Sequence, residues 1–409
     1  MHYIPRMLEG GILSASELFP VVLVTGPRQT GKTTLLRHLA QENRRYVSLD
    51  SLPTRILARE DPELFVQTYP PPVLIDEVQY APELLPVIKR ECDERQQTGL
   101  FWLTGSHHFL LMRGVSESLA GRAAIVKLNG ISERELRQID IRNPFLPSQS
   151  LEQARFPSAG RVVYREPEIF QRIFQGSYPA VLSGRVTDIQ LFYSSYTQTF
   201  LERDVRDLTQ VGNLESFFTF LRVIASRTGS ILNLSDIARD CALSVPTVKQ
   251  WLSILVATSL VYLLQPWASN KTSRLIKSPK LYFLDTGLCA WLAGYSTPET
   301  LSLGPLRGAI FETWCVSEIL KSWWYSLKEP PLYYYRDKEG REIDLLFEVD
   351  GVVHPAEIKL SATARKDWAR PLSVLEKLKV PVSRGAILCL VQEPFPLNRT
   401  TLAFPVGCI

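Results

Sequence analysis

The feature that most constrains this chain is a glycine motif that stands between an apolar run and a helical pattern. Residues 26–33 read GPRQTGKT, which has the form G-x-x-x-x-G-K-T and directly follows the apolar run VVLVT at 21–25. Glycines at both ends let the backbone curl, so that successive N–H groups and a helix N-terminus face one point and bind phosphate. The residues expected to form this phosphate-binding loop are Gly26, Pro27, Arg28, Gln29, Thr30, Gly31, Lys32, Thr33 and Thr34.

Two side chains of this loop carry its predicted chemistry. Lys32 is placed to neutralise the β- and γ-phosphate oxygens of a nucleotide, and the hydroxyl of Thr33 is placed to hold Mg²⁺. The alternative is an ordinary glycine turn before a helix, which leaves the apolar run, the Lys-Thr pair and the spacing to coincidence. We therefore expect ATP as the ligand and Mg²⁺ as the cofactor.

A second strand-like run, VLID at 73–76, ends in two acids. Asp76 can position the metal, and Glu77 can polarise the water that attacks the γ-phosphate. A solvated strand end is the alternative, and the glycine loop upstream argues against it. The next apolar run, LFWLT at 100–104, leads to Ser106, which we expect beside the γ-phosphate unless this segment is a plain turn.

Arg122 stands just before a further apolar run, AAIVKL at 123–128. In ATPases with an additional strand, an arginine at this place often reaches the nucleotide of a neighbouring subunit and stabilises the transferred charge. That role would make the protein a homo-oligomer. An exposed arginine, or one held in an ion pair within the domain, is the alternative.

The order of the apolar runs predicts an α/β fold. Short apolar runs, which also include YVSLD at 46–50, alternate with longer amphipathic segments between residues 21 and 128, which is the rhythm of βαβ units with a parallel sheet. A chain of 409 residues exceeds one ordinary core and suggests about three domains. We expect an ATPase domain at 1–150, a helical linker or lid at 151–215, a winged helix-turn-helix domain at 216–295 and an α/β domain with a mixed sheet at 296–409.

The composition excludes some classes of protein, but it does not identify a binding partner. The formal net charge is +4, which permits nucleic-acid binding but does not demand it. The six cysteines are scattered and form no zinc-ligand spacing with the five histidines. No apolar stretch is long enough to span a bilayer, so we expect a cytoplasmic protein without a membrane partner.

Two helix starts in the middle of the chain predict a helix-turn-helix. Ser235 can cap a helix that ends at Asp240, and Ser244 can cap the next, with Pro246 in its first turn. The apolar positions that would bury the second helix are Val248, Leu252 and Leu255.

The outer face of this second helix predicts contact with DNA, because its side chains are of types that touch bases and phosphates. The candidates are Thr247, Lys249 and Gln250 on the helix and Arg274, Lys277 and Lys280 in the following wing. A protein-binding module is the alternative, since winged helices also serve that purpose.

The last block holds Asp344 and, after twelve intervening residues, Glu357-Ile358-Lys359. Adjacent strands can bring Asp344 and Glu357 together, where two carboxylates share Mg²⁺ and Lys359 orients or activates a water for phosphodiester cleavage. Glu312 or Glu318 on the preceding helix can complete such a site, and we favour Glu312. A solvated strand edge is the alternative.

Taken together, these segments resemble a known family. Bacterial and archaeal AAA-type ATPases combine a P-loop domain, a winged helix and a C-terminal domain of unknown function similar to PD-(D/E)XK nucleases. The resemblance implies an AAA+ parallel sheet, a helical winged-helix domain and an α/β restriction-endonuclease-like domain. The resemblance extends from about residue 20 to about residue 390. It rests on segments that occur in this order: GPRQTGKTT, VLIDEVQ, LTGS, LAGR, LERDV, KSPKLYFLDTGL, GREIDLLFEV and AEIKLS.

Three functions follow as hypotheses. The first is Mg²⁺-dependent ATP hydrolysis coupled to the binding, remodelling, translocation or processing of DNA. The second is a nucleotide-dependent switch or scaffold that binds a protein partner and has a non-cleaving C-terminal domain. The third is an ATP-gated DNA nuclease.

Overall fold

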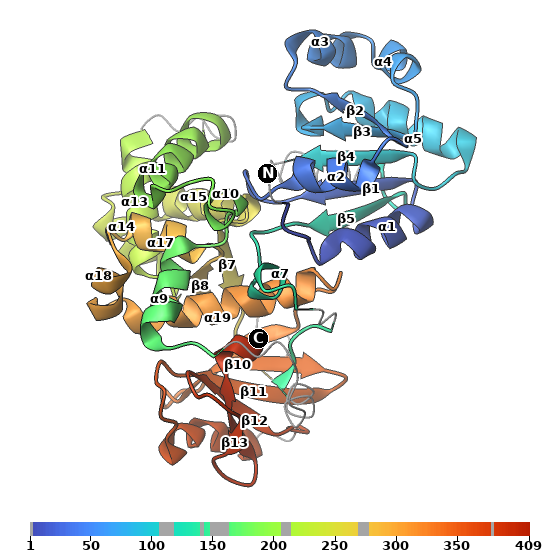
Figure 1. Ribbon diagram of the computed structural model, residues 1–409. Helices are drawn as coiled ribbons and strands as arrows, with labels where there is room; N and C mark the ends of the chain where they lie inside the picture. The colour runs from blue at the N-terminus through green and yellow to red at the C-terminus, as the bar shows by residue number, and fades with distance from the viewer. Residues whose placement is uncertain are drawn as a thin grey trace.

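The computed structural model of the protein describes residues 3–105, 118–139, 143–147, 163–205, 214–268, 278–377 and 380–409. Its strands form a five-stranded, a three-stranded and a six-stranded sheet, in that order along the chain. Figure 1 shows the N-terminal sheet in blue at one end of the molecule and the C-terminal sheet in red at the other, with helices between them.

The five-stranded sheet has the strand order β2-β3-β4-β1-β5. Every neighbouring pair is parallel, so the predicted P-loop NTPase sheet is confirmed. Its strands are β1 (Val21–Thr25), β2 (Arg45–Ser48), β3 (Val73–Asp76), β4 (Phe101–Gly105) and β5 (Ala123–Lys127). The carboxyl ends of β1 and β3 therefore point to one edge, which is where the predicted nucleotide residues begin.

Helices cover both faces of this sheet because side chains of a strand alternate between its faces. Val22 and Val24 pack in the same core as Leu36 of α2, whereas Val21 and Leu23 pack with α5 on the other side. The helices of this region are α1 (Leu8–Leu18), α2 (Lys32–Ala40), α3 (Leu52–Glu60), α4 (Pro62–Thr68), η1 (Val78–Tyr80), α5 (Leu84–Arg95) and α7 (Glu133–Leu136).

The middle of the chain is mostly helical and carries a small antiparallel sheet of order β6-β8-β7. Its strands are β6 (Ser230–Ile231), β7 (Val261–Leu264) and β8 (Lys280–Phe283). Its helices are α9 (Glu166–Gln175), α10 (Pro179–Leu182), α11 (Ile189–Thr199), η2 (Phe200–Val205), α13 (Leu214–Ser226), α14 (Leu234–Asp240), α15 (Val245–Ala257), α17 (Thr286–Leu292) and α18 (Pro298–Leu303).

The helix starts of α14 and α15 follow local capping chemistry. Asn233, not Ser235, caps α14, because its side chain accepts hydrogen bonds from the backbone of Ser235 and of the following residue. The predicted cap of α15 is correct: the Ser244 side chain accepts from the Thr247 N–H, and Pro246 lies in the first turn. The side chains predicted to bury α15, those of Val248, Leu252 and Leu255, are buried.

The C-terminal region is an α/β unit with a mixed sheet of order β13-β14-β12-β11-β10-β9. Its strands are β9 (Leu332–Arg336), β10 (Glu342–Val349), β11 (Val352–Ile358), β12 (Gly385–Cys389), β13 (Phe395–Pro396) and β14 (Thr401–Pro405). Three short helices, η3 (Lys366–Ala369), η4 (Pro371–Lys377) and η5 (Val406–Cys408), lie among them. None of the helices in the described ranges is long and apolar enough to cross a membrane.

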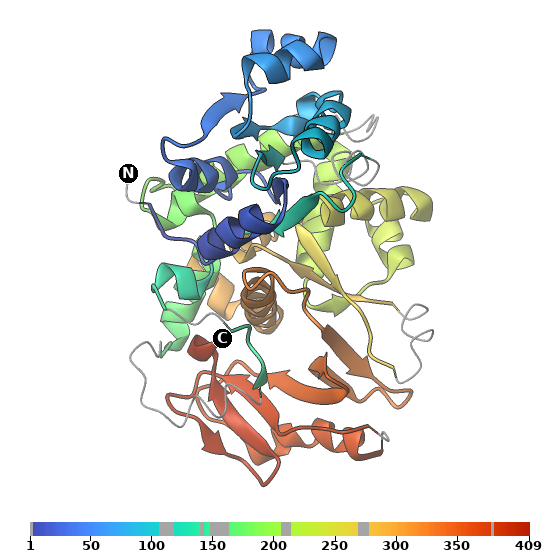
Figure 2. The same ribbon diagram turned by 90° about the vertical axis from the view of Figure 1, so that its right-hand side faces the viewer.

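Helix α19 (Arg307–Trp324) lies at the centre of the molecule. Figure 2 shows it end-on, between the blue sheet and the red sheet. Fourteen of its 18 residues are buried, and one continuous apolar core includes its side chains together with those of α1, α9 and β10. The ATPase sheet and the C-terminal sheet are therefore joined through one buried helix.

Candidate functional site

The glycine motif forms a loop between β1 and α2. Gly26 has a φ of +146°, and a Cβ there would lie 1.9 Å from the Leu128 carbonyl oxygen, so only glycine fits. Gly31 has a φ of +90° and caps α2. The buried Lys32 ammonium group donates to the carbonyls of Gly26 (3.0 Å) and Pro27 (2.8 Å). The loop therefore holds its cation against its own backbone, at the N-terminus of a helix.

Asp76 lies beside this loop at the end of β3. The Thr33 hydroxyl donates to its Oδ1 over 2.8 Å, and the Tyr46 hydroxyl donates to its Oδ2 over 3.0 Å. The Thr104 hydroxyl also donates to Asp76. Burial and the Asp76 carboxylate raise the pKa of Tyr46, so its hydroxyl stays protonated as a donor. A hydroxyl and a buried carboxylate in contact are a donor pair that suits Mg²⁺.

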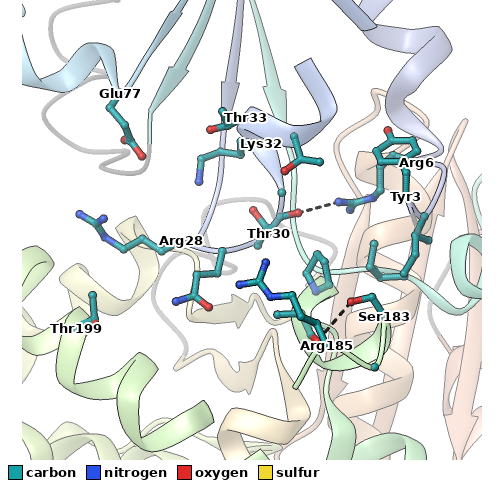
Figure 3. A pocket seen from close by; sticks show the side chains of 18 residues that line it. Tyr3, Arg6, Arg28, Thr30, Lys32, Thr33, Glu77, Ser183, Arg185 and Thr199 are labelled. Carbon is teal, nitrogen blue, oxygen red and sulfur yellow. Dashed lines mark hydrogen bonds between the residues drawn. The ribbon is translucent and has the colours of Figure 1, made fainter. Parts of the chain in front are cut away.

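Glu77 follows in a left-handed conformation, with φ 59° and ψ 46°. A residue other than glycine pays of the order of 1 kcal/mol for this conformation, so other contacts must hold it in place. Its N–H donates to the Thr104 hydroxyl over 3.0 Å, and the Gln79 amide donates to its carboxylate. The half-buried Glu77 side chain thereby lines the cavity next to the loop, as Figure 3 shows.

The cavity has a volume of about 820 Å³, within the range of small-molecule sites. Residues of two distant parts of the chain line it. Those of the N-terminal part are Tyr3, Ile4, Arg6, Arg28, Gln29, Thr30, Gly31, Lys32, Thr33, Thr34, Glu77 and Ile131, and those of the helical part are Pro179, Ala180, Ser183, Gly184, Arg185 and Thr199.

Three residues of this site were missed by the sequence analysis, whereas Thr104 lies in the segment that was expected to supply a hydroxyl there. Tyr46 lies in an apolar run that was correctly predicted as a strand, which was the available signal. Arg185, an exposed cation directed into the cavity in Figure 3, and Arg6 belong to no motif. Ser106 lies outside the described residues.

Arg122 lies at the amino-terminal ends of the strands, opposite the phosphate-binding loop. It directly precedes β5, whose Ala123 pairs in register with Val21, the first residue of β1. The phosphate-binding loop instead follows the last residue of β1. Its guanidinium donates to Asp93 over 2.6 and 3.1 Å. Arg122 thus cannot serve the nucleotide site of its own chain, and only a neighbouring subunit's site is left for the predicted role.

The C-terminal motif assembles on β10 and β11. The antiparallel register pairs Leu345 with Ala356, which makes Asp344 and Glu357 neighbours. The Lys359 ammonium group donates to Asp344 Oδ2 over 3.2 Å and to Glu357 Oε2 over 2.6 Å. Burial and Asp344 raise the pKa of Glu357 to about 8. Burial opposes the charge of Lys359, but the two carboxylates raise its pKa above the ordinary value.

A second lysine enters the same group of acids. Lys280, in β8, is 3% exposed, and its Nζ lies 2.5 Å from Glu342, 3.2 Å from Glu312 and 4.0 Å from Asp344. It is not the exposed wing residue that the sequence predicted, because a buried ammonium group in three carboxylate contacts cannot follow a DNA backbone. We call Glu312, Glu342, Asp344 and Glu357 the acidic cluster.

The acidic cluster only partly fits a metal ion. The Oε1 atom of Glu357 is buried and has no hydrogen-bond partner among the described residues, so Asp344 and Glu357 offer two carboxylates. Glu312, however, accepts from the Tyr282 hydroxyl over 2.6 Å and from Lys280. The described part of the chain brings together no group of three His, Cys, Asp or Glu side chains that is able to hold a metal. The predicted set of Glu312, Asp344 and Glu357 is thus not assembled as metal ligands.

Of the two helical acids considered from the sequence, Glu312 and Glu318, the structure places only Glu312 in the acidic cluster. Burial and the nearby Asp344 raise the pKa of Glu312, whereas Glu318 pairs with Lys321 over 2.7 Å and accepts from the Glu133 N–H over 2.8 Å. Glu312 is therefore the helical acid that faces the cluster.

The predicted DNA-facing side chains of α15 differ in exposure. Lys249 and Gln250 are exposed, whereas Thr247 is half-buried and shares a hydrogen bond of 2.7 Å with the Ser244 hydroxyl. Arg274 and Lys277 lie outside the described residues. Of the four predicted contacts that the structure describes, Lys249 and Gln250 are therefore exposed to a partner without rearrangement.

Comparison with known proteins agrees with the geometry of the nucleotide site. Residues 18–137 match the model of an AAA domain. The P-loop region is therefore similar to an AAA domain. Residues 166–299 and 307–409 of the same chain match two models that are each described as a domain of unknown function.

Relatives are similar to this chain over most of its length. Uncharacterized proteins of Mycobacterium bovis and Mycobacterium tuberculosis are each 29% identical over 394 residues, which cover 95% of this chain and 81% of theirs. Among solved structures, the Walker-type ATPase PABY2304 of Pyrococcus abyssi has a TM-score of 0.44 and 17% identity, covering 71% of this chain and 96% of that one. The RuvB branch migration motor of Thermotoga maritima has a TM-score of 0.32 and 16% identity, covering 63% and 88%.

Proposed function

We propose that this protein is a Mg²⁺-dependent ATPase whose hydrolysis cycle acts on DNA through the helix pair α14 and α15. The observation that carries the ATPase part is the 2.8 Å hydrogen bond between Thr33 and Asp76, with Glu77 lining the same cavity. These are the hydroxyl, the metal carboxylate and the catalytic carboxylate that phosphoryl transfer to water requires, and they meet at the N-terminus of a helix.

Each of these side chains has a defined task in the proposed reaction. The backbone N–H groups of the loop and the Lys32 ammonium bind the phosphates of ATP. Thr33 and Asp76 would hold Mg²⁺, which supplies neutralisation of phosphate charge when bound. Glu77 orients the attacking water and takes up its proton. Arg122 would act only on the ATP of a neighbouring subunit. This role requires a homo-oligomer, which we therefore propose.

The DNA part of the proposal rests on the surface of α15. Lys249 and Gln250 are exposed on its outer face, while the inner face is buried against the rest of the helix pair. We assign residues 216–295 to this winged-helix unit, 151–215 to a helical lid, and 1–150 and 296–409 to the ATPase and nuclease-like domains. An exposed lysine and an amide side chain on such a helix suit the major groove.

Charge reversal on α15 tests this part. Lys249→Glu is expected to weaken DNA binding about tenfold at low salt and to reduce the salt dependence, because one phosphate contact becomes repulsive. The measurements are DNA affinity against salt and ATPase rate with single-stranded, duplex and branched DNA. Lys328→Glu, which reverses another exposed lysine, is the matched control. Wild-type protein without salt-sensitive DNA binding or DNA-stimulated hydrolysis would contradict the DNA part alone.

A second function is favoured by the acidic cluster: a nucleotide-dependent switch that binds a protein partner, with a C-terminal domain that does not cleave DNA. Each carboxylate of the cluster lies within 4.0 Å of Lys280 or Lys359, so these two ammonium groups offset half of the charge of four carboxylates. A group of acids that already contains two cations has less need of a metal ion.

Cleavage assays separate this switch from the ATP-gated nuclease. We expect no Mg²⁺-dependent cleavage of single-stranded, duplex or branched DNA by the wild type, and a stoichiometric protein partner that is lost from the Lys32→Ala variant. Cleavage that disappears in Asp344→Ala, with ATP hydrolysis retained, would instead establish the nuclease.

A further inference from the structure

Arg6, which precedes α1, joins segments that are far apart in the sequence. Its guanidinium is 3% exposed and donates to the carbonyls of Thr30 and Asn129, each over 2.9 Å, and to the Tyr325 hydroxyl over 3.2 Å. It also forms an ion pair of 2.9 Å with Glu135. One buried side chain therefore contacts the phosphate-binding loop, the segment after β5 and the end of α19.

The ion pair fixes this guanidinium in place. The Glu135 side chain is fully buried and also accepts from the backbone N–H groups of Met7 (2.9 Å) and Ser132 (2.8 Å). A buried charge that loses its partner costs several kcal/mol, so Arg6 and Glu135 hold one another in a single geometry. The guanidinium is thus a rigid point of attachment for the groups around it.

The contact with Thr30 controls the direction of a neighbouring N–H group. In a planar trans peptide the C=O and the following N–H point in opposite directions. Arg6 binds the Thr30 carbonyl, as the dashed line in Figure 3 shows, and this turns the Gly31 N–H to the other side of the peptide. Gly31 lines the cavity and caps the N-terminus of α2, so its N–H is one of the groups expected to bind phosphate.

The contact with Tyr325 leads to the C-terminal region. Tyr325 is the C-cap residue of α19, and its hydroxyl also donates to the Gly130 carbonyl. Glu312, on the same helix, lies about 20 Å away along the helix axis and belongs to the acidic cluster. Because α19 is buried over most of its length, a shift at one end has to be accommodated at the other.

We infer that Arg6 is a positioning residue for the phosphate-binding loop and that it connects this loop, through Tyr325, to α19 and the acidic cluster. The inference rests on the proposed binding of ATP. It assigns to Arg6 no contact with the reacting atoms; its effect passes through the Thr30–Gly31 peptide on one side and the Tyr325 hydroxyl on the other.

Binding measurements with the full chain test the positioning role. Arg6→Gln is expected to weaken ATP affinity about tenfold, corresponding to about 1.4 kcal/mol, and to leave the much weaker binding of adenosine unchanged, because only phosphate contacts are lost. Arg6→Lys keeps the charge beside Glu135 and is expected to lie between Arg6→Gln and the wild type. Arg134→Lys is the matched control, since Arg134 is equally buried and binds the carbonyls of Asn143 and Ile409 instead of the loop.

Hydrogen exchange tests the connection. ATP is expected to slow amide exchange in the last turns of α19 in the wild type and to do so several-fold less in Tyr325→Phe, which lacks the hydroxyl that Arg6 contacts. Unchanged ATP affinity in Arg6→Gln, or an ATP effect on α19 that persists in Tyr325→Phe, would overturn this inference but not the proposed function. A wild type that binds no ATP would overturn the proposed function and the inference with it.

Discussion

Replacing Glu77 by glutamine is expected to lower the kcat of ATP hydrolysis by about 10²-fold to 10⁴-fold, the usual range for loss of a general base. Glutamine has the same shape and keeps a carbonyl oxygen to accept from Gln79, but it cannot take a proton from water. The Glu77 backbone is held by its N–H bond to Thr104, which does not depend on the side chain. ATP affinity should therefore stay near the wild-type value.

Steady-state hydrolysis and equilibrium ATP binding together check this result. Glu83→Gln is the matched control, because Glu83 is an exposed glutamate in the same segment and does not line the cavity. A Glu77→Gln protein that hydrolyses ATP at the wild-type rate would show that another group activates the water. A protein that loses ATP binding would show that Glu77 has a structural role.

Replacing Lys280 by methionine is expected to destabilise the contacts of β8 with α19 and β10 by about 3–5 kcal/mol, as for other buried ion pairs that lose one partner. Methionine fills the space of the lysine stem but leaves Glu312, Glu342 and Asp344 without the ammonium group that they share. Like charges in a buried site then repel one another. Amide exchange in β8 and β10, measured in the full chain, reports this local loss of stability.

The pH dependence of the stability that Lys280→Met loses gives an independent check. Burial opposes the charge on Lys280, but Glu312, Asp344 and Glu342 raise its pKa above the ordinary value, so its stabilising effect is complete at neutral pH and is lost only in strong alkali. In the variant the uncompensated carboxylates bind protons more tightly. The stability difference from the wild type should therefore shrink as the pH falls from about 8 to about 5.

A second substitution serves as the control. Glu342→Gln removes one of the three carboxylates and should recover part of the stability of Lys280→Met, while alone it should be mildly destabilising. If the double variant is as unstable as Lys280→Met and the deficit does not change with pH, the loss comes from packing of the lysine stem and not from charge.

Much of the fold could be predicted because its signals are local. The five parallel strands agree with the predicted runs to within one or two residues, since a buried strand is a short apolar segment wherever it lies in the sheet. The cap of α15 was correct because Ser244 bonds the backbone three residues on. The cap of α14 was wrong because Asn233 and Ser235 are both good caps, and only the geometry of the first turn decides between them.

The sequence by itself determined the phosphate-binding loop and the acids at the end of β3. Gly26, Lys32 and Thr33 lie within one strand–loop–helix unit, and parallel pairing brings Asp76 to the same edge. Their spacing along the chain therefore fixes their spacing in space. This is why the residue types at those positions were enough to predict a nucleotide site.

Only the tertiary structure decided the partners of Arg6 and Lys280. Arg6 meets Tyr325 across 319 positions of sequence, and Lys280 meets Glu312 across 32, through elements whose packing no local pattern encodes. A lysine in an apolar strand looks the same in sequence whether it faces water or three carboxylates. The physical difference is burial: it makes an ionic group depend on its partners, and those partners are chosen by how distant elements pack.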